Sequence, residues 1–284
     1  MKRQKSFESD HPKLYIVATP IGNLNEMTPR AIDILNEVDV IACEDTRHSS
    51  KMLKHFNIKT KLISHQKFNE SESVKGILML LHQGMNVALI SDAGYPLISD
   101  PGHELVNAVI HHGFNVIPIS GSSALLNALV ASGIVTQPFY FHGFLPNQQK
   151  EIIGVLTRVR HYQATLIFYE SPHRIAKTLR HCLELLGDRK AVLVRELTKL
   201  HEEFLRGTLS ELVEEATDLK GEMVLIIEKD EGTKLPDMDL NDVYSKIEEF
   251  IALGFSAKDA ISEVAKLSGY RKKEVYELYH TKRC

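Results

Sequence analysis

The segment whose residue types are best suited to ligand binding is 91–102, which begins with Ser-Asp-Ala-Gly and ends with Asp-Pro-Gly. Gly94 allows a close approach of the backbone to a ligand, and the Asp92 carboxylate can accept hydrogen bonds from a ribose or an amine. Pro101 and Gly102 are suited to open the next helix. The segment follows a predicted strand, and ligands of open parallel sheets bind outside the carboxyl ends of strands. An ordinary turn with a helix cap is the alternative.

Two other loops follow predicted strands and carry small or polar residues, 18–24 and 120–124. The first lacks the G-x-G-x-x-G spacing of a dinucleotide-binding turn, and the chain has no G-x-x-x-x-G-K-[ST] phosphate loop, so NAD and nucleoside triphosphate sites are disfavoured. The second can hold a ligand carboxylate at a helix N-terminus, although a plain cap fits equally well. Because all three loops follow strands of one predicted sheet, we expect their tips to meet at one edge.

Charged groups also gather at two strand ends. Residues 44–47, Glu-Asp-Thr-Arg, can orient a ribose and its phosphate, or can form a helix N-cap followed by a surface arginine. Arg174, Arg195 and Lys199 offer phosphate contacts, with solvated surface charge as the alternative. The histidines lack metal-ligand spacing, and no metal site is expected. Those nearest the motifs are His65, His103, His142 and His173.

Composition excludes several classes of protein. With 284 residues, 43% hydrophobic and 25% charged, the chain is expected to fold into two domains, or two and a small appendage. No apolar run reaches the roughly 18 to 20 residues of a membrane span, and the start is polar, so we expect a cytoplasmic protein. Three distant cysteines argue against a disulfide framework. A net charge of −3 means that RNA binding would require a local basic surface.

The first half alternates continuous apolar runs with amphipathic helical patterns. This alternation predicts a parallel sheet covered on both faces, a doubly wound α/β domain. The predicted strands are 14–18, 39–42, 61–63, 87–90 and 115–118, and the predicted helices are 29–37, 46–56, 71–82, 102–112 and 122–131.

Strand and helix signals resume after a break at 131–138, where Gly133 and Pro138 interrupt the pattern. Two of the new strands follow each other closely, which predicts a mixed sheet. A polar stretch, 229–242, is typical of a linker, and the helical patterns beyond it have a helix-turn-helix outline around 268–270. The expected organisation is a flexible tail (1–12), an N-terminal α/β domain (13–132), a second α/β domain (133–230) and a linker with a helical segment (231–284). The strands expected in the second half are 139–142, 164–169, 191–194, 203–205 and 223–228, and the helices are 149–159, 173–186, 209–217, 257–267 and 272–280.

Together these motifs resemble the tetrapyrrole methylase superfamily of S-adenosylmethionine-dependent methyltransferases. The resemblance covers residues 13–229, and Gly121-Ser122-Ser123 departs from the usual Gly-Pro-Ser. Two of the motifs are typical of one branch, which methylates the ribose 2′-hydroxyl of a cytidine in 16S rRNA: Glu-Asp-Thr-Arg at 44–47 and Arg-Glu-Leu-Thr-Lys at 195–199. The motifs that carry the resemblance are 17–24, 44–47, 91–102, 168–174 and 195–199.

The resemblance implies S-adenosylmethionine bound in a cleft between two α/β domains, and usually a homodimer. For Tyr169 and Leu197, core packing at strand ends is the alternative to cofactor contact. The positions that match the family's cofactor contacts are Pro20, Gly22, Asp92, Ala93, Gly94, Leu97, Ser122, Ser123, Ala124, Tyr169, Leu197 and Met223, together with the other residues of 92–97 and 221–224.

The implied substrate is 16S rRNA within the 30S subunit, and the enzyme would mainly have to align the 2′-oxygen with the methyl group. Asp45, Glu170 or a desolvated Lys199 can serve as a base or stabilise the alkoxide, whereas arginine remains charged and cannot be a base. The substrate-side candidates are Asp45, Arg47, Glu170, Arg195, Glu196 and Lys199, with Arg174 at the RNA.

From residue 270 onward, five Lys or Arg face two Glu. Arg271, Lys272 and Lys273 can contact rRNA phosphates, or can form an ordinary solvated helix face. Two other functions stay open. A porphyrinoid methyltransferase is the first, as in other branches of the superfamily. A non-catalytic RNA-binding module on the same scaffold is the second.

Overall fold

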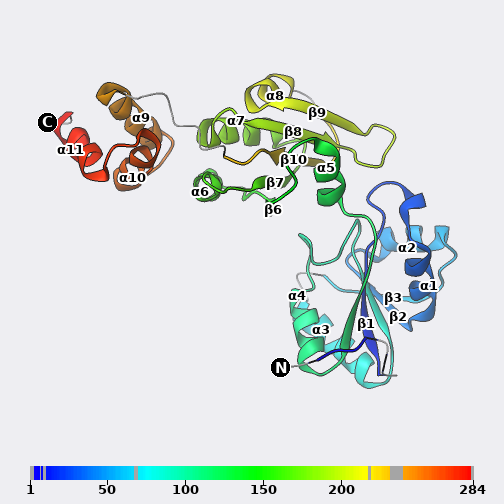
Figure 1. Ribbon diagram of the computed structural model, residues 1–284. Helices are drawn as coiled ribbons and strands as arrows, with labels where there is room; N and C mark the ends of the chain where they lie inside the picture. The colour runs from blue at the N-terminus through cyan, green and yellow to red at the C-terminus, as the bar shows by residue number, and fades with distance from the viewer. Residues whose placement is uncertain are drawn as a thin grey trace.

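The computed structural model describes residues 3–6, 8, 11–66, 70–216, 219–230 and 239–282. Within these residues the chain forms two five-stranded sheets followed by three helices (Figure 1). The predicted fold class, two α/β units and a small helical segment, is confirmed. Most of the predicted linker, residues 231–238, lies outside the described residues. No helix in the described ranges has the length and apolar character needed to cross a membrane.

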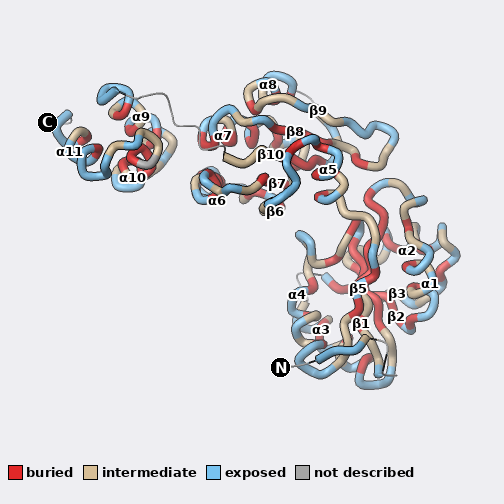
Figure 2. Tube along the Cα trace, viewed as in Figure 1, coloured by how far each residue is buried: buried red, intermediate tan, exposed pale blue. Residues whose placement is uncertain are grey.

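The first sheet is parallel throughout, with the strand order β3-β2-β4-β1-β5. Every residue of β2 and β4 is buried, which explains their continuous apolar runs. The burial view shows these strands enclosed between exposed helix faces (Figure 2). The strands are β1 (Lys13–Val17), β2 (Val40–Cys43), β3 (Lys61–Ser64), β4 (Val87–Ile90) and β5 (Asn115–Ile119).

Four helices cover the two faces of this sheet. Helices α1 (Pro29–Glu37) and α2 (Thr46–His55) pack on one face, and α3 (Glu70–His82) and α4 (His103–His111) pack on the other. A short 3-10 helix, η1 (Leu24–Glu26), was not expected from the sequence. The predicted N-terminal tail also has a partner in the sheet: the Gln4 amide donates to the carbonyl of Val116 at 2.9 Å and accepts from its N–H at 3.2 Å.

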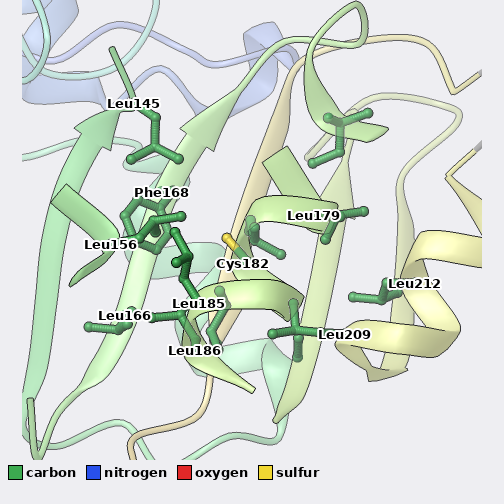
Figure 3. Close-up of a cluster of buried hydrophobic side chains, with 14 of the residues drawn as sticks. Leu145, Leu156, Leu166, Phe168, Leu179, Cys182, Leu185, Leu186, Leu209 and Leu212 are labelled. Atoms are coloured by element: carbon green, nitrogen blue, oxygen red, sulfur yellow. The ribbon is translucent and has the colours of Figure 1, made fainter. Parts of the chain in front are cut away.

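The second sheet has the order β6-β7-β10-β8-β9. Strands β6 and β7 are parallel and the other pairs are antiparallel, so the predicted mixed sheet is confirmed. Helices α6 (Gln149–Val159), α7 (Ile175–Leu186) and α8 (Leu209–Glu215) cover one face (Figure 3). The strands are β6 (Phe139–Phe144), β7 (Thr165–Glu170), β8 (Lys190–Arg195), β9 (Glu203–Thr208) and β10 (Met223–Ile227).

Helix α5 (Ala124–Ser132) covers the other face of the second sheet, although it follows the last strand of the first. Its buried Leu125, Ala128 and Leu129 join a core with residues of β7, β8 and β10. The domain boundary between residues 132 and 133 stays a prediction. The packing of α5 nevertheless shows that this helix covers a face of the second sheet.

The C-terminal helices form a bundle with its own core at the end of the molecule away from the first sheet (Figure 1). They are α9 (Leu240–Ala252), α10 (Ala257–Ser268) and α11 (Lys272–Lys282), and the turn between α10 and α11 matches the predicted helix-turn-helix outline. Helix α9 begins inside the segment predicted as linker. The polar residues there are its cap, since Asp239 and Asp242 form a capping box.

The bundle docks on the second sheet unit through charged and aromatic contacts. The guanidinium of Arg160 lies 5.5 Å from the ring centroid of Phe250, and His161 approaches Glu263 at 3.5 Å. Leu253 and Phe255 also pack against the core formed by α6, α7 and α8. These contacts join the bundle to the α/β body.

Candidate functional site

A cavity of about 680 Å³ lies between the two sheets. This volume is within the range of sites that enclose small organic ligands. Its walls come from loops after β1, β2, β4, β5, β7 and β8 and from the start of β10. The residues that line it are Ile21, Glu44, Asp92, Ala93, Gly94, Tyr95, Ile98, Ser99, Asp100, Ser123, Ala124, Phe144, Tyr169, Glu170, Ser171, Pro172, Glu196, Leu197, Lys199, Gly221, Glu222, Met223 and Val224.

Hydrogen bonds tie three of these loops together. Thr19 and Gly94 exchange two backbone bonds, at 2.9 and 3.0 Å. The Thr19 hydroxyl donates to the carbonyl of Ser91 at 3.1 Å, and the N–H of Gly121 donates to the hydroxyl of Tyr95 at 3.1 Å. The predicted meeting of loops 18–24, 91–102 and 120–124 at one sheet edge is therefore confirmed.

The loop after β4 holds its shape at some conformational cost. Leu97 and Ser99 have φ angles of 71° and 72°, in the left-handed region that non-glycine residues rarely adopt. Gly94 also has a positive φ, of 76°, but glycine adopts it without a Cβ penalty. Two strained residues in one loop are more often found at functional sites than in ordinary turns. They lie on either side of Ile98 and directly precede Asp100, and both of these residues line the cavity.

Three carboxylates, Glu44, Asp92 and Asp100, line the same region of the cavity. Among the described residues, none of the three forms an ion pair with a Lys or Arg. Burial is the main cause that raises the pKa of Asp100 to about 6, and the charges of Glu44 and Asp92 contribute to this rise. A pKa raised by neighbouring carboxylates indicates a negative potential, which favours a cationic ligand.

Glu170, on the opposite wall, has both carboxylate oxygens engaged. It is 2% exposed, and it accepts hydrogen bonds from the Thr178 hydroxyl at 2.6 Å and from the Ser171 N–H at 2.8 Å. Arg174 approaches it at 3.5 Å and donates to the carbonyls of Leu145 and Pro146. Glu170 and Arg174 therefore fix the loops around β7.

The loop after β8 carries a network of charged groups. Lys199 donates to Glu196 at 2.9 Å and to Glu222 at 3.2 Å. Burial acts to lower the pKa of Lys199, but the hydrogen bonds and charges of Glu196 and Glu222 outweigh burial and raise that pKa. The hydrogen bond from Lys199 in turn lowers the pKa of Glu196. Lys199 is thus held as a cation, which disfavours its use as a base.

Arg195 and the 44–47 block are engaged locally. Arg195 pairs with Glu203 and lies 3.5 Å from the carbonyl of Lys220. Asp45 caps α2 by accepting from the Arg47 N–H at 2.8 Å, and its ion pair with the Arg47 guanidinium measures 3.2 Å. A hydrogen bond from the Arg47 side chain is the main cause that lowers the pKa of Asp45. In this block, the geometry matches the helix-cap alternative.

The structure brings about half of the predicted site residues to the cavity. Those that line it are Asp92, Ala93, Gly94, Ser123, Ala124, Tyr169, Glu170, Glu196, Leu197, Lys199 and Met223. Those outside its lining are Pro20, Gly22, Asp45, Arg47, Leu97, Ser122, Arg174, Arg195, Arg271, Lys272 and Lys273.

Some of the residues outside the lining have clear structural partners. The Ser122 hydroxyl donates to Glu26 at 3.0 Å, and Leu97 packs against the core under α3 and α4. On α11, Lys272 donates to Ser262 at 3.1 Å and Lys273 lies 3.9 Å from Glu277.

The sequence pointed to no role for several lining residues, among them Ile98, Asp100 and Phe144. Asp100 belongs to the loop already singled out at 91–102, so its carboxylate was a usable signal. Phe144 had none, because only the packing of the two sheets brings it to the cavity. In the described part of the chain, no group of three or more His, Cys, Asp or Glu is placed to hold a metal ion.

Comparison with known proteins identifies a family and close relatives of this chain. The family model of the tetrapyrrole (corrin/porphyrin) methylases matches residues 13–213. Two curated proteins called ribosomal RNA small subunit methyltransferase I are similar over 99% of this chain and 99% of their own length: 48% identical in Halalkalibacterium halodurans and 44% in Bacillus subtilis.

A solved structure has the same fold at lower identity. Uroporphyrin-III C-methyl transferase from Thermus thermophilus, complexed with S-adenyl homocysteine, matches with a TM-score of 0.55 and 19% identity, over 76% of this chain and 97% of that one. The extent of the family match and the high identity of the curated relatives confirm the resemblance noted in the motifs. The chain belongs to the tetrapyrrole (corrin/porphyrin) methylase family.

Proposed function

We propose that this protein transfers a methyl group from S-adenosylmethionine to the ribose 2′-oxygen of a cytidine in 16S rRNA, as a step of ribosome biogenesis in the cytoplasm. The names of the curated relatives support the rRNA substrate. The observation that carries the proposal is the cavity between the sheets, whose lining combines apolar side chains with three carboxylates that form no ion pair with a described Lys or Arg. That combination suits a ligand that is both cationic and partly aromatic.

The residues present fit the cofactor in charge and in polarity. S-adenosylmethionine supplies a methyl group on a positively charged sulfonium, and it also carries an ammonium group. Glu44 and Asp92 would face these cationic groups, and Ile21 and Leu197 offer an apolar surface for the adenine. Asp92 and Asp100 lie in the loop that hydrogen bonds with Thr19 hold against the loop after β1.

Catalysis would rest mainly on holding the ribose oxygen in line with the methyl group. A ribose hydroxyl is a weak acid, so a nearby proton acceptor helps. Of the acidic groups in the cavity, Glu170 is fully hydrogen-bonded, whereas Asp100 has a pKa near 6 and is ionised at neutral pH. Asp100 is therefore the best-matched base, and the ammonium of Lys199 can stabilise negative charge that develops on the oxygen.

The test is methyl transfer from labelled S-adenosylmethionine to small ribosomal subunits from a strain that lacks the gene. We expect label in 16S rRNA, and we expect mass spectrometry to locate it on the ribose of one cytidine. Label on a base, or a ribose-methylation map that is the same with and without the gene, would contradict the proposal.

The charge of the cavity also bears on the porphyrinoid alternative. Porphyrinoid precursors carry many carboxylates, and of the described residues that line the cavity, six are acidic and one is a lysine, Lys199. The acidic ones are Glu44, Asp92, Asp100, Glu170, Glu196 and Glu222. Such a cavity repels a polyanion, whereas a neutral ribose can enter while its phosphates stay outside. Transfer to a porphyrinoid but not to small subunits would reverse this preference.

Calorimetry separates an enzyme from a non-catalytic RNA-binding module. A catalytic protein must bind S-adenosylmethionine, and substitution in the acidic cluster must weaken that binding. A module that has lost catalysis would show no heat of cofactor binding in either form.

The assembly we propose is a homodimer that uses α5. Leu126 and Val130 are four residues apart on this helix, so they share a face, and they are 47% and 74% exposed. Val135 and Phe139, just after the helix, are also exposed. Exposed apolar side chains that gather in one region are typical of a protein interface.

A further inference from the structure

Helix α2 carries a concentration of basic side chains. Arg47, His48, Lys51, Lys54 and His55 are all exposed, and the helix contains no acidic residue between Thr46 and His55. The whole chain has a net charge of −3, so this helix departs from its surroundings. We call the five side chains the α2 basic face.

The five residues lie on one side of the helix. At 3.6 residues per turn they fall within an arc of about 120°. Ser49 and Leu53, which are buried, point to the opposite side, where Leu53 joins the core of the first sheet. The basic face is therefore directed to solvent by the packing of the helix, and its charges lie side by side along about two turns.

The α2 basic face begins at the rim of the cavity. Helix α2 starts two residues after Glu44, which lines the cavity, and Asp45 is its N-cap. From there it returns along the sheet to β3, the edge strand. A chain bound along α2 would thus have one of its residues at the cavity entrance.

Three other cations near the cavity are already engaged. Lys199 pairs with Glu196 and Glu222, and Arg195 pairs with Glu203. The Arg174 guanidinium donates to two backbone carbonyls and to Asn147. By contrast, Lys51 and Lys54 form no ion pair with any described residue.

We propose that the α2 basic face binds the phosphate backbone of the rRNA strand next to the target nucleotide. The proposal rests on the proposed function. The acidic cavity would admit the neutral ribose, and the phosphates on either side of that ribose would then need cations outside the cavity. In this proposal, Lys51 and Lys54 contact phosphates. Such contacts position the strand but do not recognise its sequence. A nucleotide that enters the cavity must leave its base stack, and contacts to the flanking backbone hold it there.

The test is the double variant Lys51→Ala/Lys54→Ala, assayed for methyl transfer to small ribosomal subunits from a strain that lacks the gene. The KM for subunits is expected to rise about 10-fold, with kcat and the Kd for S-adenosylmethionine unchanged. The dependence of log(1/KM) on log[salt] should become shallower by about 1.4, that is, about 0.7 for each phosphate contact to a single strand. The variant Lys51→Arg/Lys54→Arg should keep the KM and the salt dependence of the native protein, because it keeps both charges.

The matched control is Lys75→Ala/Lys177→Ala, which removes two exposed lysines from α3 and α7. If this control changes the KM and the salt dependence as much as the α2 variant does, the effect is one of overall charge and the proposal is wrong. An α2 variant with native KM and native salt dependence would also overturn it. A native protein that transfers no methyl group to small subunits would instead contradict the proposed function.

Discussion

Gly22 and Lys199 are in contact although they come from different halves of the chain: a β-carbon on Gly22 would lie 2.6 Å from Cγ of Lys199. It would also lie 2.9 Å from the Thr198 hydroxyl and 3.1 Å from the carbonyl of Leu197. The loop after β1 therefore sets the position of the loop after β8. Since Leu197 and Lys199 line the cavity, this contact fixes the distance between its two walls.

Substitution of Gly22 by alanine should disturb the cavity. The added methyl group has no room and must push the loop of Lys199 outward, because two of its three neighbours would be closer than 3.0 Å. We expect a loss of about 10-fold in affinity for S-adenosylmethionine, or about 1.4 kcal/mol, by calorimetry. The control is Gly76→Ala, on α3, where a β-carbon meets no atom within 4 Å. Equal affinities for the two variants would contradict the proposed role of the contact.

Removal of the Asp92 carboxylate should weaken cofactor binding. Asp92 lines the cavity and has no ion pair with a described residue, so its charge is available to a cationic ligand. Asp92→Ala is expected to raise the Kd for S-adenosylmethionine about 10-fold or more. Asp33→Ala is the matched control, since Asp33 is exposed on α1, away from the cavity lining. A Kd that stays native in Asp92→Ala would remove this residue from the cofactor site.

Asp100→Asn should make the protein more stable at pH 7 and less active. The pKa of Asp100 is raised to about 6 in the folded protein, from an ordinary value of 3.8. Protonated Asp100 thus favours the folded state at low pH, and this advantage is lost as the pH rises from about 4 to about 6. Asparagine avoids this loss, so we expect the free energy of unfolding at pH 7 to rise by about 1 kcal/mol. This is less than the pKa shift alone would give, because the side chain is only half-buried.

Two measurements check the substitution at Asp100. Urea unfolding at pH 7 and at pH 4 should show the gain at pH 7 and its absence at pH 4. The kcat for rRNA methylation at pH 7 should fall by about 100-fold if the carboxylate accepts the proton. A variant with native kcat would show that another group accepts it.

The charge of Lys199, and not its ability to lose a proton, should matter for activity. Its pKa is raised by Glu196 and Glu222, so it remains protonated at neutral pH. We expect Lys199→Met to lose about 100-fold in kcat/KM and Lys199→Arg to lose much less, because arginine keeps the positive charge. A pH–rate profile of the native enzyme should show no limb that disappears in Lys199→Arg. An arginine variant as inactive as the methionine variant would favour a role as base.

Val130→Asp should dissociate the proposed homodimer. Val130 is 74% exposed, so an aspartate is tolerated in the monomer, but it would be buried without a partner in a dimer that uses α5. An unpaired buried charge costs about 3 kcal/mol or more, which is over 100-fold in the dimer dissociation constant. Light scattering after gel filtration measures the mass. Met79→Asp, at an exposed position on α3, is the control and should leave the mass of the native protein unchanged.

The fold was predictable because the buried strands have a strong local signal. In β2 and β4 every residue is buried, so the strands appear in the sequence as unbroken apolar runs between amphipathic helices. The predicted end of the linker at residue 242 was wrong for an equally local reason, since α9 already begins at Leu240. Its first residues are polar because they form a cap, and a polar cap after a charged stretch looks like part of a linker.

The candidate site was predictable only where one loop contains several of its groups. Residues 91–102 have Asp92, Gly94 and Asp100 in one segment, and the structure brings all three to the cavity. Phe144 comes from the end of β6 in the second sheet, and its place depends on how two separate cores meet. The partners of Arg174 and Arg195, a backbone carbonyl and the Glu203 carboxylate, are likewise set by tertiary packing. Free and engaged arginines therefore look alike in the sequence.

Strand β10 occupies the centre of the second sheet, between β7 and β8, although it is the last strand of that sheet to be synthesised. The nascent chain therefore cannot close this sheet until residue 227 has left the ribosome. Until then, the apolar side of α5 has no complete sheet to cover, while all five strands of the first sheet are already available. During synthesis, the wall of the cavity that comes from the first sheet can therefore form before the wall that comes from the second sheet.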